Sequence, residues 1–223
     1  MKSILKKLLK YFGKSYDIDD DIPNNFVSYI FNKRLWMLFK GLLFYRKKVF
    51  LGRKIDFLNK KNVSLGKYVT IENNVILDGF CKEEIKIGAY SKIGAFSEIS
   101  CTGHFSKYGK GFSFGENSGV GKFAFFGSAG GIKIGDNVIM GEYVSFHSQN
   151  HNFLNKEELI RNQGVTSKGI EIGNNVWVGA KCTFLDGSFV GDNCVVAAGA
   201  VVKDVFPNDV LIGGVPARII KKI

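Results

Sequence analysis

The residues most suited to chemistry are the three histidines, His104, His147 and His151, and two of them lie in VSFHSQNHNFL at 144–154. Histidine titrates near neutral pH, with an ordinary pKa of about 6.5, and it is also the commonest metal ligand. A metal needs several converging ligands, whereas a general base needs one imidazole facing the substrate. His104 lies apart from the other two, in a stretch typical of a surface turn. We therefore predict no metal site.

The element around these histidines is a six-residue repeat that runs from residue 51 onward. Its units, such as IGDNVI at 134, MGEYVS at 140, IGNNVW at 172 and VGDNCV at 190, contain an aliphatic residue, usually Gly, two polar residues and a small or β-branched residue. Neither an amphipathic helix nor an alternating strand has this period. A hexapeptide period indicates a parallel β-helix, an all-β solenoid in which each unit forms one short strand and one turn.

The repeat is interrupted near residues 80–86, 102–113 and 152–171. We expect the first two interruptions to be extended turns and the third to be a true loop. Long loops on a rigid scaffold often carry function.

These repeats resemble those of the left-handed β-helix acyltransferases, in which three hexapeptides form one triangular coil. The resemblance covers roughly residues 51–206 and implies about seven coils. In the acetyltransferases of that family a coil ends in a catalytic histidine, a loop follows, and the next coil opens with a motif like IGNNVWVGA, found here at 172–180. The order of motifs implies that His151 is the general base, with His147 at most supporting it. The sequence does not identify the group that orients His151, and Glu142 is a candidate because it lies in the same coil.

The C-terminal stretch AAGAVVKDVFPNDVLIGGVPARIIKKI at 197–223 resembles the donor-binding end of the same family. There, small residues let the pantetheine arm of coenzyme A lie along the edge of the helix, and basic residues meet its phosphates. The resemblance also implies that amides around Gly179 and Ala180 stabilise the oxyanion. A simple capping strand is the alternative explanation of the tail. The predicted acetyl-CoA-binding residues are Trp177, Gly179, Ala180, Ala198, Gly199, Lys203, Pro216 and Arg218.

The loop HNFLNKEELIRNQGVTSKGIEIG at 151–173 resembles capsular and exopolysaccharide O-acetyltransferases more than the galactoside and maltose enzymes, whose histidine usually precedes a proline. We predict that Asn150, Arg161 and Gln163 bind the carbohydrate acceptor, although Arg161 could equally anchor the loop. The resemblance implies an acetyl-CoA-dependent sugar O-acetyltransferase working as a homotrimer, with direct transfer at a site between subunits. An N-acetyltransferase, a metal hydratase like the gamma-class carbonic anhydrases, and a non-catalytic scaffold are the alternatives.

Residues 1–48 differ from the β-helix domain at 49–223. Residues 1–50 hold 11 Lys/Arg and 4 Asp, a charge of +7 out of the total of +11. Residues 4–12 and 24–46 have helical patterns, and Pro23 suits a first helical turn. We expect either a helical cap on the β-helix or a peripheral membrane contact. Because the basic residues are concentrated here rather than spread through the fold, we predict no nucleic-acid binding.

The four cysteines show no metal-binding spacing, and the N-terminus lacks the pattern of a signal peptide. We expect reduced thiols at core positions and a cytoplasmic protein.

Overall fold

The computed structural model describes residue 2, residues 18–103 and residues 107–223. The chain forms two compact units, residues 1–50 and 51–223, which are described separately. The division lies two residues from the boundary expected from the sequence. No helix among the described residues is long and apolar enough to cross a membrane.

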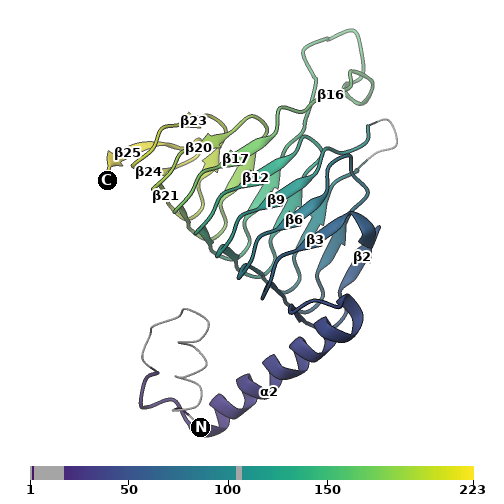
Figure 1. Ribbon diagram of the computed structural model, residues 1–223. Coiled ribbons are helices and arrows are strands. Elements are labelled where there is room, and N and C mark those ends of the chain that lie inside the picture. The colour runs from purple at the N-terminus through teal and green to yellow at the C-terminus, as the bar shows by residue number, and fades with distance from the viewer. Residues whose placement is uncertain (1, 3–17, 104–106) are drawn as a thin grey trace. The chain divides into compact units, whose positions relative to one another are not determined.

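In the first unit, α2 (Asn24–Lys40) continues into the π-helical turn η1 (Gly41–Tyr45). Pro23 is the N-cap residue, where its missing N–H costs nothing. η1 ends at Arg46, which has a left-handed φ of 54°. The helix expected over residues 24–46 is therefore present (Figure 1). The helix expected over residues 4–12 lies outside the described residues.

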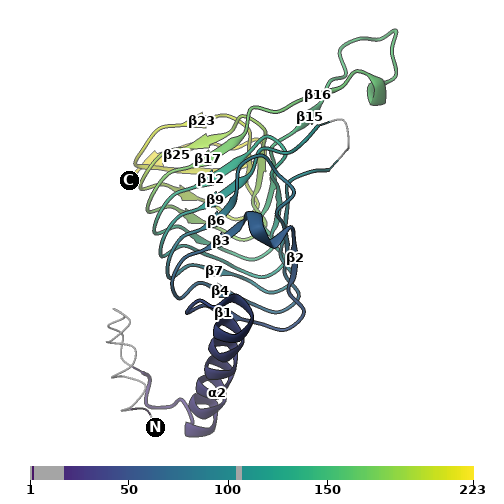
Figure 2. The same cartoon turned by 45° about the vertical axis from the view of Figure 1, so that its right-hand side comes forward.

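The second unit is a three-sided stack of parallel strands, with one side of the triangle contributed by each sheet (Figures 1 and 2). The first sheet contains, in order, β1 (Phe50–Leu51), β4 (Thr70–Ile71), β7 (Lys92–Ile93), β10 (Gly119–Val120), β13 (Ile139–Met140), β18 (Trp177–Val178), β21 (Val195–Val196), β24 (Val210–Gly213) and the antiparallel β25 (Arg218–Lys222).

The second sheet contains β2 (Asp56–Leu58), β5 (Ile76–Asp78), β8 (Glu98–Ser100), β11 (Phe125–Gly127), β14 (Ser145–His147), β19 (Thr183–Leu185) and β22 (Val201–Val202). The third contains β3 (Val63–Leu65), β6 (Ile85–Ile87), β9 (Phe112–Phe114), β12 (Ile132–Ile134), β17 (Ile170–Ile172), β20 (Phe189–Val190) and β23 (Val205–Phe206). A separate two-stranded sheet joins β15 (Asn150–His151) to β16 (Val165–Thr166), and η2 (Lys60–Asn62) and η3 (Ile160–Asn162) are short 3-10 helices. The predicted solenoid of about seven coils is confirmed.

The core follows from the six-residue unit, because its aliphatic and its small or β-branched residues both point inward. In the unit at 134, for example, Ile134 and Val138 are both buried. Phe126, Phe146 and Phe184 occupy the same place in successive coils, and their rings stack with centroids 5.0 and 4.4 Å apart. The four cysteines are buried free thiols, as expected. Burial raises the pKa of Cys182, which keeps that thiol protonated.

Two corners of the triangle are regular. At the third–first corner, where the chain passes from the third sheet to the first, and at the first–second corner, most turns contain four residues, such as 135–138, 141–144 and 173–176. The third residue of these turns has a left-handed φ, as at Asn137, Tyr143 and Asn175. Asparagine tolerates that conformation, and the Asn175 amide donates to Asn193 Oδ1 in the next coil at 2.9 Å.

The remaining corner, the second–third corner, is irregular. Its connections are residues 79–84, 101–111 and 148–169 in three coils, but only 186–188 and 203–204 in the last two. All three interruptions of the repeat thus leave the solenoid at one corner. The longest forms a hairpin that projects from the stack (Figure 2).

Candidate functional site

The projecting loop at 148–169 presents His151 on a short antiparallel hairpin. Asn150 pairs with Thr166 and His151 pairs with Val165. The pairing continues to Asn152, whose backbone N–H donates to Gly164 O at 3.1 Å and whose side-chain amide donates to Gln163 O at 2.9 Å. These bonds fix the backbone around His151, while its side chain is exposed. No hydrogen bond to the imidazole is found within the described ranges.

The tip of the loop is held by Gln163, which was predicted to bind substrate. Its side-chain amide donates to Asn155 O and to Glu158 O, each at 2.8 Å, and its Oε1 accepts from Asn155 N at 3.1 Å. Both the nitrogen and the oxygen of the side-chain amide are thus hydrogen-bonded within the loop, which favours a role for Gln163 in holding the loop conformation. Arg161, in η3, is exposed.

The return of the loop to the solenoid depends on Asp186, which the sequence analysis did not single out. Its Oδ1 accepts hydrogen bonds from the backbone N–H groups of Lys168 at 2.7 Å and Gly169 at 2.8 Å. Lys107, in the neighbouring interruption, donates to Ser167 Oγ at 2.8 Å. The DG pair at 186–187 suggests a turn, but only the folded chain shows that the carboxylate supports the loop.

His147 and Glu142 do not lie where a partner of His151 would be expected. His147 remains in β14, with its ring centroid 5.7 Å from that of Phe125. Glu142 is in the turn at 141–144, at the first–second corner, whereas His151 extends from the second–third corner. Glu142 is therefore separated from the histidine loop of its own chain by the width of the second sheet. No cluster of three metal-ligating side chains occurs in the part of the chain that is described, and His104 lies outside it.

Half of the predicted donor residues lie at the first–second corner. Ala180, Ala198 and Gly199 are exposed in the turns of the last two levels, and a Cβ added to Gly199 would meet no atom within 4 Å. At earlier levels the third turn position is filled by exposed rings, Phe96, Phe123 and Tyr143, stacked at 5.1 and 4.9 Å. Along this edge the third turn position thus holds rings at the three middle levels, Lys181 at the next level and no side chain at Gly199 in the last.

The two amides predicted to form the oxyanion hole are not equivalent. Gly179 N–H donates to Val196 O at 2.8 Å, so it belongs to the backbone ladder. No partner of Ala180 N–H is found among the described residues. The Ala180 amide is therefore the better candidate of the two.

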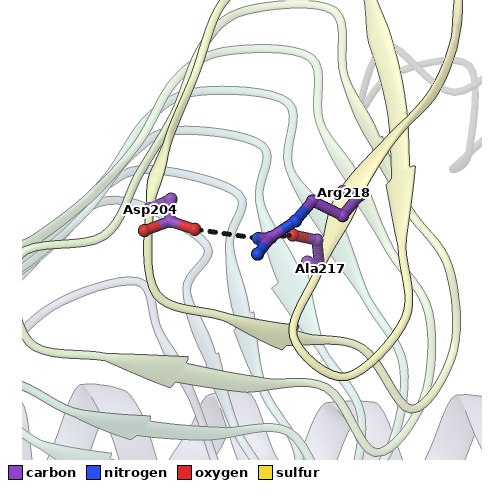
Figure 3. Close-up of polar contacts among 3 residues, drawn as sticks. All are labelled: Asp204, Ala217 and Arg218. Atoms are coloured by element: carbon purple, nitrogen blue, oxygen red, sulfur yellow. Dashed lines mark hydrogen bonds and ion pairs between the residues drawn. The ribbon is translucent and has the colours of Figure 1, made fainter.

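The C-terminal tail covers the end of the second sheet. Gly214 O accepts from Val201 N, and Ala217 N donates to Val201 O at 2.8 Å, so this segment lies along β22. Arg218 Nη1 then donates to Asp204 Oδ2 at 3.0 Å and to Ala217 O at 2.8 Å (Figure 3). The predicted phosphate ligand Arg218 thus has a carboxylate partner. Lys203 lies next to that carboxylate in the sequence, and Lys203 and Pro216 are exposed. Trp177, on the outer face of β18, is 59% exposed.

A shallow groove of about 290 Å³ lies on the outer face of the third sheet, along the second–third corner. Gly111, Gly131, Gly169 and Gly187 contribute to its lining, and Lys133 at its rim pairs with Glu171 at 3.0 Å. None of the predicted site residues lines this groove. The predicted residues are instead spread over two corners of one chain.

The class of protein follows from this architecture and from solved structures: it is a left-handed β-helix of hexapeptide repeats. Residues 169–204 match the family described as "Bacterial transferase hexapeptide (six repeats)". A hexapeptide-repeat acetyltransferase from Vibrio cholerae, solved with acetyl coenzyme A, is 27% identical, with a TM-score of 0.53 over 61% of this chain and 70% of that one. An N-acyltransferase from Bacillus cereus, 19% identical with a TM-score of 0.54 over 79% and 81%, shares the fold.

Two relatives come from Escherichia coli strain K12. Galactoside O-acetyltransferase is 38% identical over 92 residues, which is 41% of this chain and 44% of the relative. The putative lipopolysaccharide biosynthesis O-acetyl transferase WbbJ is 29% identical over 116 residues, or 49% and 59%. The chain thus spans about half the length of these relatives. Over the parts that they cover, these matches show that the chain is similar to hexapeptide-repeat transferases.

Proposed function

We propose that the protein is an acetyl-CoA-dependent O-acetyltransferase that modifies a sugar hydroxyl of a surface polysaccharide or of its precursor. The observation that carries this proposal is the presentation of His151. The regular repeat ends at His147, four residues earlier, and a hydrogen-bonded hairpin holds His151 outside the solenoid with its imidazole exposed. The two Escherichia coli relatives, both named as O-acetyltransferases, support the reaction class.

The chemistry requires one base and one oxyanion donor. The imidazole of His151 removes the proton of the sugar hydroxyl as its oxygen attacks the thioester carbonyl. The Ala180 N–H stabilises the oxyanion that forms. The C–S bond then breaks, and the imidazolium returns the proton to the departing thiolate, which leaves acetylated sugar and coenzyme A. A positioned base contributes about 10²–10⁴-fold to such a step.

The last two levels of the first–second corner suit the donor. The pantetheine arm is thin and linear, and Ala180, Ala198 and Gly199 leave an open strip along the edge at the last two levels. Lys203 and Arg218 are the candidate phosphate ligands near the C-terminal end. Asp204 holds the Arg218 guanidinium through one nitrogen, Nη1, so the pair orients the group that meets a phosphate.

We propose that a second copy of the chain completes the site. His151 and the donor strip lie at different corners of the triangle, and the second sheet separates them. The outer face of the first sheet carries Ile139 and Trp177 side by side, 65% and 59% exposed. The hairpin tip exposes Phe153, Leu154, Leu159 and Ile160. A closed trimer would cover these apolar surfaces and bring the histidine of one copy to the donor strip of the next.

The acceptor is proposed to bind beside His151, with Asn150 and Arg161 as its contacts. Asn150 precedes the base in β15, and Arg161 is in the exposed η3. The buried free cysteines suit a reducing compartment, so we place the reaction in the cytoplasm.

The test compares His151→Ala with His147→Ala. The first variant should lose about 10²–10⁴-fold in acetyl transfer, measured by mass spectrometry over a panel of glycans, and keep acetyl-CoA binding in calorimetry. The second is a matched control, because His147 stays in the regular repeat, and it should retain most of the activity. Near-normal turnover by His151→Ala would refute the assignment. Transfer only to amino sugars would indicate an N-acetyltransferase.

A further inference from the structure

Residues 22–50, which include α2 and η1, carry only positive side-chain charges, all of them between residues 33 and 48. They contain six basic residues and no Asp or Glu. The basic residues are Lys33, Arg34, Lys40, Arg46, Lys47 and Lys48. An excess of positive charge within a segment attracts an anionic partner.

The same segment exposes large apolar side chains. Seven of them are between 48% and 63% exposed: Phe26, Tyr29, Leu35, Trp36, Phe39, Leu42 and Leu43. Tyr29, Trp36 and Phe39 lie at i, i+7 and i+10, which places them on one side of the helix. The rings of Trp36 and Phe39 stack with centroids 5.4 Å apart. Val27 and Met37, on a different side of the helix, are buried.

The end of the helix brings basic residues next to this apolar surface. A Cβ on Gly41 would lie 1.9 Å from Val49 O, so glycine is needed for the chain to fold back there. Lys47 N donates to Gly41 O at 3.4 Å within the same return. The turn thus holds Arg46 and Lys48 close to Leu42 and Leu43 at the end of the helix.

We propose that the seven apolar side chains and the basic turn at 46–48 together bind the surface of an anionic phospholipid membrane. Aromatic and leucine side chains next to lysine and arginine are the features of a helix that lies in a membrane interface. A nucleic acid would use the charge but leave the apolar surface exposed. A second copy would bring six further positive charges against the same segment, so the charge opposes self-association. The proposal does not depend on the reaction assigned above.

The experiment uses the full chain in a Trp177→Phe background. The sequence contains two tryptophans, so the fluorescence of this variant comes from Trp36. The probes are vesicles of phosphatidylcholine alone and vesicles of equal parts phosphatidylglycerol and phosphatidylcholine. We expect co-sedimentation with the phosphatidylglycerol vesicles and a blue shift of the Trp36 emission. Phe39→Glu should lower the partition coefficient by about tenfold or more. Arg46→Gln and Lys48→Gln should each lower it about fivefold on the anionic vesicles.

Phe80→Glu is the matched control, since Phe80 is 52% exposed on the β-helix and should have no effect on partitioning. The proposal fails if the chain does not bind phosphatidylglycerol vesicles, or if it binds both compositions equally. It also fails if sedimentation velocity shows an oligomer that Phe39→Glu dissociates, because the surface would then be a protein interface. Binding is measured without substrate, so this outcome is separate from the acetyl-transfer result.

Discussion

The regular and irregular corners of the β-helix join the same strands around the same core, yet they behave differently. The third–first and first–second corners turn in four residues at most levels, whereas the second–third corner ranges from residues 203–204 to the long connection 148–169. Loop closure costs only about 0.6 kcal/mol for each doubling of length. The irregular corner can therefore carry a loop such as that of His151, while the regular corners preserve the stacking.

A second difference lies within the first–second corner. Its third turn position holds stacked aromatic rings at the three levels before the histidine loop, and Lys181 and Gly199 after it. The same turn geometry thus accepts an aromatic ring, a lysine or a glycine, and only the glycine leaves the position without a side chain.

After the loss of the His151 base, the largest expected effect comes from filling the edge at the last level. Ala198→Phe should weaken acetyl-CoA binding by about tenfold or more, because the ring would occupy the proposed path of the pantetheine arm. Isothermal titration calorimetry measures this loss. Lys122→Phe, at the same turn position three levels earlier, is the matched control and should leave binding unchanged. Equal binding by both variants would place the donor elsewhere.

The anchor of the histidine loop should have the next largest effect. Asp186→Ala removes the acceptor of two backbone N–H groups, and each hydrogen bond to a charged group contributes about 1.5–3 kcal/mol. We expect faster amide exchange at Lys168 and Gly169 and a fall of about tenfold in kcat/KM, or about 1.4 kcal/mol. Asp186→Asn keeps an acceptor and should lose less. Unchanged exchange in Asp186→Ala would show that the loop does not depend on this carboxylate.

A regular corner can be tested through Asn193. This residue has a φ of 56°, and its amide donates to Asp209 Oδ1 at 3.0 Å. Asn193→Ala should lower the free energy of unfolding by about 1–2 kcal/mol, because alanine is disfavoured in the left-handed region. Asn193→Gly loses the same hydrogen bonds without that backbone cost, so chemical denaturation of both variants separates the two contributions. Equal stabilities would remove the backbone explanation.

The smallest effect is expected in the core at the irregular corner. Ser188 is 2% exposed, and its hydroxyl has no hydrogen-bond partner among the described residues. Ser148, also buried at this corner, donates to Gly127 O at 2.7 Å and accepts from Gly130 N at 2.9 Å. Ser188→Ala should therefore stabilise the protein by about 1 kcal/mol, and Ser148→Ala should destabilise it by about as much. The two thermal midpoints should move in opposite directions, and a shift of both in the same direction would contradict this.

The repeat was predictable from the sequence because it is a local property. Each unit places an aliphatic and a small or β-branched residue at inward positions, as with Ile134 and Val138. Units that share this pattern bury these residues by stacking on one another. The break in the six-residue repeat near His151 was predictable for the same reason, because a departure from a strict period can be seen in the amino-acid sequence. The contacts of Gln163 were not, because a loop amide can face either a substrate or its own backbone.

The sequence by itself thus determined the solenoid and the approximate places where it is interrupted, although the longest connection begins at residue 148 rather than at 152 as expected. Only the tertiary structure decided that all three interruptions share one corner, that Asp186 holds the returning chain, and that Glu142 lies at a different corner from His151. The physical reason is the range of the interactions. The six-residue pattern is set by neighbouring residues, whereas the corner a residue reaches depends on the summed length of every turn before it.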